Sequence, residues 1–135
     1  MPRSPDPAER VCAALRVELT TAMKQRDPDA VVAFRTAIAA IENAQAVEVR
    51  DTGLGATMAH MSRAGHGAEL PRRELSDAQV DAIIRAQINE RQQDSTRYDT
   101  LGQAEAATHL RAEAAALSRA WKSITGDSER PRPTA

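Results

Sequence analysis

Four basic side chains stand where their charge could do chemistry: Lys24, Arg26, Arg35 and Arg91. Lys24 and Arg26 lie at the corner that Asp27-Pro28 is expected to form between two helices, whereas Arg35 and Arg91 lie on or beside apolar helix faces. The planar guanidinium fork of arginine suits a phosphate or a carboxylate. One interpretation therefore places Arg35 and Arg91 in a groove that takes such a group, while Lys24 and Arg26 are either partner contacts or simply solvated charges.

The alternative is a structural network between helices. At 100° per residue, Gln87, Arg91 and Asp94 fall in the middle of an apolar stripe, and Glu42 lies two turns beyond Arg35 on the same side of its helix. A buried arginine costs several kcal/mol unless it is paired. In this interpretation, which we favour, Arg91 pairs with Glu42 or Asp94, and Arg35 pairs with another acid.

Other reactive side chains do not form a recognisable site. His60 and His66 lie in a glycine-rich stretch without a nearby cysteine or Glu-x-x-His motif, so we expect no metal site. Cys12 has no histidine near it in the sequence and is expected to be a small core residue. Because no acid, base and nucleophile come together, we expect no catalytic residues and no cofactor, and an enzyme is the least supported class.

Composition indicates one soluble domain with a thin core. The chain has 135 residues, of which 41% are hydrophobic and 27% charged, with a net charge of −1. Alanine supplies much of the hydrophobic fraction and buries little area, so self-association could add stability. The balanced charge excludes a globally basic nucleic-acid-binding protein. No signal segment or apolar run long enough for a membrane span is present, so we expect a cytoplasmic protein, and the preference for arginine over lysine hints at a bacterial source.

Capping and breaking residues predict an all-α bundle of four antiparallel helices. The helices are expected from Pro7 to about Arg26, from Pro28 to about 47–49, over 77–101, and from about 104 to 124, with a long loop at about 50–74. We expect one domain over 6–125, with disordered ends at 1–5 and 126–135. The expected apolar stripes contain Ala8, Val11, Cys12, Leu15, Leu19, Ala22 and Met23; Val31, Phe34, Ile38 and Ile41; Val80, Ile83, Ile84, Tyr98 and Leu101; and Ala106, Leu110, Ala114, Leu117, Trp121 and Ile124.

Two blocks of the sequence resemble one known family. "LTTAMKQRDPDAVVAFRTAIAAIENAQ" (Leu19–Gln45) and "ELSDAQVDAIIRAQINERQQDSTRYDTLGQ" (Glu74–Gln103) are similar in order and spacing to the GatB/YqeY family. That family occurs as the C-terminal domain of the B subunit of the Asp/Glu-tRNA amidotransferase and as free-standing YqeY-like proteins without an established activity. In the amidotransferase this region is helical and helps to engage tRNA, while the chemistry lies elsewhere.

The resemblance implies a non-catalytic helical module that binds tRNA or a tRNA-associated protein. Lys24, Arg26, Arg35 and Arg91 stand at matching positions, whereas Ala86, Gln87 and Gln103 replace polar or charged residues of the family, and we expect the family's second helical subdomain to be absent. The first hypothesis is weak RNA binding through Lys24, Arg26 and Arg35. The alternative is a protein-interaction or homo-oligomerisation module without an RNA role.

Overall fold

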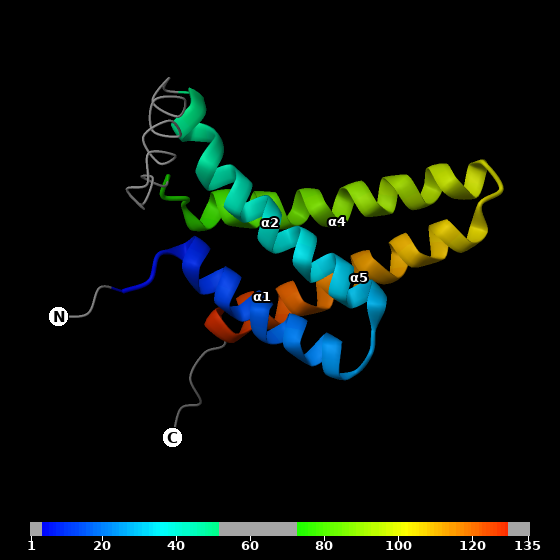
Figure 1. Ribbon diagram of the computed structural model, residues 1–135, viewed down its shortest axis with the longest axis horizontal. Helices are drawn as coiled ribbons and strands as arrows, with labels where there is room; N and C mark the ends of the chain where they lie inside the picture. The colour runs from blue at the N-terminus through cyan, green and yellow to red at the C-terminus, as the bar shows by residue number, and fades with distance from the viewer. Residues whose placement is uncertain (1–3, 52–72, 130–135) are drawn as a thin grey trace, which may run out of the picture.

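The computed structural model describes residues 4–51 and 73–129, and these form four helices without a strand (Figure 1). The helices are α1 (Pro7–Lys24), α2 (Pro28–Asp51), α4 (Asp77–Thr100) and α5 (Ala104–Glu129). The prediction of a small all-α bundle is therefore confirmed. Residues 52–72 of the predicted loop lie outside the described residues, as do 1–3 and 130–135.

The first residues of the helices agree with the prediction better than the last residues do. The Asp6 carboxylate accepts the Glu9 backbone N–H at 2.8 Å, which caps α1. At α4, Ser76 and Gln79 form a reciprocal capping box, with distances of 3.1 and 2.8 Å. In contrast, α2 continues to Asp51 and α5 to Glu129, beyond the predicted ends, because neither terminus contains a residue that must break a helix.

The corner between α1 and α2 is a Schellman motif built around Arg26. Its backbone N–H donates to the Met23 carbonyl at 3.2 Å, and the Asp27 N–H donates to the Ala22 carbonyl at 3.0 Å. This arrangement requires a left-handed residue at the first position outside the helix, and Arg26 has φ of 56°. Asp27 then caps α2, since its carboxylate accepts the Ala30 N–H at 3.2 Å. The predicted corner at Asp27-Pro28 is confirmed.

The corner between α4 and α5 repeats the same backbone motif with glycine in the left-handed position. Gly102 has φ of 76°, and its N–H donates to the Asp99 carbonyl at 3.0 Å. The Gln103 N–H donates to the Tyr98 carbonyl at 2.8 Å. The molecule therefore contains two helical hairpins that are closed by equivalent turns.

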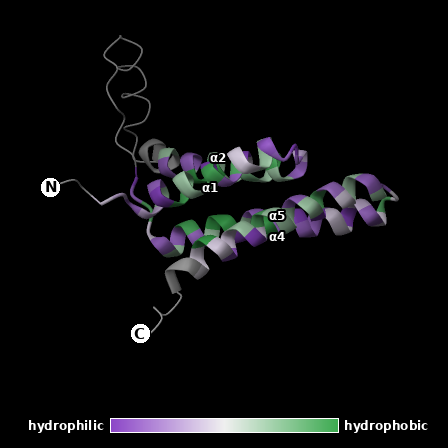
Figure 2. Ribbon diagram, turned by 90° about the horizontal axis from the view of Figure 1, so that it is seen from below, coloured by the Kyte–Doolittle hydropathy of each residue, from purple (hydrophilic) through white to green (hydrophobic). Residues whose placement is uncertain are grey.

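The two hairpins form two layers. α4 packs more extensively against α5 than against any other helix, and α2 crosses this pair while α1 packs beside α2 (Figure 1). Viewed from below, α1 and α2 form one layer and α4 and α5 the other (Figure 2). The α4–α5 turn and the helical segments next to it extend past the end of the α1–α2 layer. We call this projection the α4–α5 arm.

The core lies where the two layers meet. Its largest fully buried side chains are Leu15, Ile41, Val80, Ile84 and Leu117, and alanines fill the close helix contacts. Most predicted stripe residues are buried or partly buried, but Leu101 is 62% exposed and Met23 52% exposed, so these two predictions are wrong. Leu101 ends α4 at the tip of the arm, beyond the reach of α1 and α2, and Met23 lies in the last turn of α1.

Candidate functional site

Arg91 is a buried structural residue that joins three helices. Arg91 as a whole is 8% exposed, and its Nε donates to the Glu113 carboxylate at 3.0 Å. Nη1 donates to the backbone carbonyl and the side-chain oxygen of Gln87, at 3.1 and 2.9 Å, and Nη2 donates to the Thr36 hydroxyl. Because these groups surround the guanidinium, Arg91 is not presented to an outside ligand.

The network therefore exists, but its partners differ from those expected. Glu42 instead pairs with Arg16 of α1 at 3.1 Å, and Asp94 pairs with Arg97 of its own helix at 3.7 Å. The pairing of Arg91 with Glu42 or Asp94 was wrong because the acid that faces the α4–α5 seam is Glu113 of α5. Sequence periodicity gives the face of one helix and does not identify the residue opposite it.

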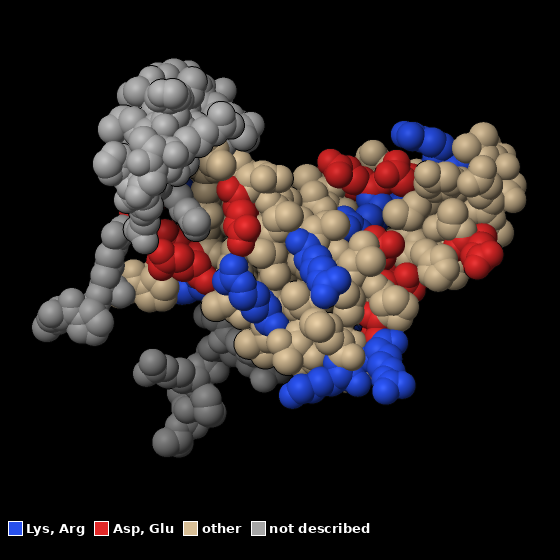
Figure 3. All heavy atoms as spheres, viewed as in Figure 1, with Lys and Arg blue, Asp and Glu red and all other residues tan. Residues whose placement is uncertain are grey.

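Lys24, Arg26 and Arg35 remain on the surface, and we call these three residues the basic corner. All three are exposed, and within the described residues none of them makes an ion pair, so the expected acid partner of Arg35 is not found there. Lys24 ends α1, Arg26 forms the turn, and Arg35 lies seven residues into α2, about 10 Å along the helix axis. Figure 3 shows basic side chains at the lower edge of this view, where α1 ends and α2 begins.

The acids nearest the turn in sequence are engaged elsewhere. Asp27 caps α2, and Asp29 lies 2.9 Å from Nδ1 of His109 on α5. Hence neither carboxylate pairs with Lys24 or Arg26, and the basic corner offers cations that an anionic partner could contact without first breaking an ion pair.

Most other described cations are already paired. Arg10 contacts Asp77 at 3.1 Å, Arg85 contacts Asp81 at 2.8 Å, and Arg111 contacts Asp99. Two exposed cations on α5, Arg119 and Lys122, make no ion pair with a described residue. This pair was not predicted from the sequence, although its i,i+3 spacing on α5 is a signal that could have indicated it.

The Asp81 carboxylate links α4 to α5, and its hydrogen-bond partners lower its pKa. It accepts hydrogen bonds from Nε of Arg85 at 2.8 Å and from Nε1 of Trp121 at 2.9 Å. The hydrogen bond from Arg85, followed by that from Trp121, holds the pKa of this carboxyl below its ordinary value of 3.8. Its partners lie on α4 and α5, so its role is structural.

Two hollows in the described part of the surface do not gather catalytic groups. A cavity of about 120 Å³ is lined by Cys12 and by charged side chains of both signs, including Glu9, Arg16 and Glu42. Burial raises the pKa of the Cys12 thiol, which keeps it protonated and a poor nucleophile. Cys12 is buried, as its predicted core role requires.

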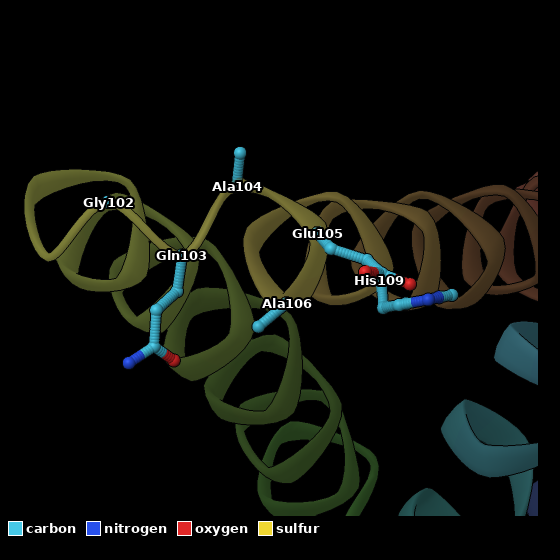
Figure 4. Close-up of a pocket in the computed structure, with 6 residues that line it drawn as sticks. All are labelled: Gly102, Gln103, Ala104, Glu105, Ala106 and His109. Atoms are coloured by element: carbon cyan, nitrogen blue, oxygen red, sulfur yellow. The ribbon is translucent and has the colours of Figure 1, made fainter.

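A second, wider hollow of about 570 Å³ lies against the first turn of α5 (Figure 4). In this hollow the Gln103 side chain extends away from Glu105 and His109, so the polar groups of these three residues do not converge on one point. Among the described residues no group of three or more His, Cys, Asp or Glu could hold a metal ion. The candidate metal ligands His60 and His66, which we expected not to form a site, lie outside the described residues.

Comparison with known proteins gives no relative: no family model, curated protein or solved structure matches the chain. The GatB/YqeY resemblance therefore stays a prediction. None of the described helices combines the length and apolar character that a membrane crossing requires.

Proposed function

We propose that this chain is a non-catalytic, cytoplasmic helical module of GatB/YqeY type that binds tRNA or an RNA-bearing partner through the basic corner. The observation that carries the proposal is the exposure of Lys24, Arg26 and Arg35 around one turn, without an ion pair to any described residue. Arg91 is not part of the proposed binding surface, because its guanidinium is buried and hydrogen-bonded.

Three cations support a weak and salt-sensitive interaction. Each phosphate that a lysine or arginine neutralises releases counterions, so three contacts give a slope of log K against log salt of about −2 to −3. The net charge of −1 adds no long-range attraction to this local contact. Binding should therefore be detectable at low salt and lost near physiological salt.

The experiment is a filter-binding titration of bulk tRNA at about 50 mM salt. We expect the double variant K24A/R26A to lose most of the affinity of the wild type. The matched control R119A/K122A removes the same charge from exposed, unpaired residues on α5 and should bind as the wild type does. No affinity in the wild type, or an equal loss in both variants, would falsify the proposal.

A second candidate function is self-association. It is favoured by four large apolar side chains that are exposed among the residues whose burial the structure describes: Val17, Met23, Val32 and Leu101. Sedimentation velocity across micromolar concentrations separates the two candidates. A concentration-dependent dimer that the L101S variant disrupts would support self-association, whereas a strict monomer would exclude it.

A further inference from the structure

The two Schellman corners use different residues at the same backbone position. Gly102 holds the left-handed conformation between α4 and α5, with φ of 76°, and a Cβ built there would meet no atom within 4 Å. Arg26 holds the corresponding position between α1 and α2, with φ of 56°. A left-handed conformation is unfavourable for any residue with a Cβ and carries no such cost for glycine.

Contacts with the described residues do not account for an arginine at this position. The Arg26 side chain is exposed, and its guanidinium makes no hydrogen bond or ion pair with a described residue. The hydrogen bonds of the turn use the backbone N–H groups of Arg26 and Asp27, which a glycine variant would retain. No interaction of the Arg26 side chain with a described residue therefore offsets the cost of its left-handed conformation.

We infer that Arg26 anchors the partner by binding a phosphate group of its backbone. This inference rests on the function proposed above and names both the anchoring residue and the class of group that it binds. Residues in disfavoured backbone conformations concentrate at functional sites, where the geometry serves binding. The turn places Arg26 two residues after Lys24, so the two cations can approach neighbouring phosphates.

The basic corner has no phenylalanine, tyrosine or tryptophan on which a base could stack. Recognition of single-stranded bases relies largely on stacking against exposed aromatic side chains. Phe34 and Trp121 are buried in the core, at 4% and 7% exposure, and the half-buried Tyr98 lies on the α4–α5 arm. The contact through Arg26 is thus independent of nucleotide sequence, as expected of phosphate recognition.

The test moves the arginine between the two equivalent turns. R26G should unfold at the same or a higher urea concentration than the wild type, because it relieves the left-handed arginine. Its affinity for tRNA should fall about tenfold, the effect of one charge-assisted hydrogen bond. The swap variant R26G/G102R has the composition and net charge of the wild type, and it should bind as weakly as R26G.

The outcomes separate this inference from the proposed function. If the wild type binds tRNA and either R26G or the swap variant binds equally well, the inference is overturned and the proposed function stands. If the wild type binds no tRNA at about 50 mM salt, both are overturned. A duplex RNA of unrelated sequence should bind with an affinity similar to that of tRNA, and a strong preference between them would contradict sequence-independent phosphate binding.

Discussion

Replacing Glu113 with alanine should strongly destabilise the fold, because it leaves the charge of Arg91 buried without its anion. The side chains of Arg91 and Glu113 are only 10% and 14% exposed, so water can do little to replace the lost carboxylate. Removal of one partner from a buried ion pair costs about 3–5 kcal/mol. A domain of this size has a total unfolding free energy of about 5–15 kcal/mol, so the loss takes a large share of it.

Urea unfolding followed by circular dichroism at 222 nm measures this effect. The exposed pair between Arg16 and Glu42 provides a matched control, since its side chains are 58% and 49% exposed. E42A also removes one glutamate from an inter-helix pair and should cost only about 0–1 kcal/mol.

A double-mutant cycle isolates the interaction itself. The cycle consists of R91M, E113L and the double variant R91M/E113L. The double variant removes both charges and keeps apolar bulk at the helix crossing, so it should be much more stable than the sum of the losses in R91M and E113L implies. An E113A loss below about 1 kcal/mol, or additive single and double effects, would refute the reasoning that this pair is buried and coupled.

Three further predictions test the core, a cap and one titrating group. L117A removes a completely buried side chain and should cost about 2–5 kcal/mol in the same urea assay. D27A removes the cap of α2 and should cost about 1 kcal/mol, and a cost near zero would contradict the capping geometry. Asp81 has a lowered pKa in the folded state because of Arg85 and Trp121, so its stabilising effect is complete above its ordinary value of 3.8 and is lost as pH falls through the folded pKa. The unfolding free energy of D81N should therefore differ from that of the wild type by a constant amount at neutral pH and converge with it in acid, as urea titrations at several pH values would show.

Features set by local chemistry were predictable from the sequence. The caps at Asp6, Asp27 and Ser76 involve hydrogen bonds to residues only three positions away, so the starts of α1, α2 and α4 each follow from a short segment. The turn at Gly102 is equally local, because glycine tolerates the left-handed conformation. These signals are sufficient to define four helices and their order.

Features set by contacts between helices were not predictable in detail. The partner of Arg91 depends on how α4 and α5 are rotated against each other, which brings Glu113 to it from 22 positions along the chain. The exposure of Leu101 depends on how far the α4–α5 arm extends past the other layer. The three cations of the basic corner were named from the sequence. That Asp27 and Asp29 do not pair with them became clear only from the structure, in which both carboxylates are engaged elsewhere.

The hairpin of α4 and α5, whose outer part is the arm, also has a consequence for the order of folding. Its two helices follow each other in the chain, and their mutual contacts are the most extensive in the molecule, so this hairpin can form with a small loss of loop entropy. Assembly with α1 and α2 then requires contacts between distant parts of the chain, which are slower to form. We therefore expect this hairpin to be the folding nucleus, so that alanine substitutions along the seam between α4 and α5 slow refolding more than they speed unfolding.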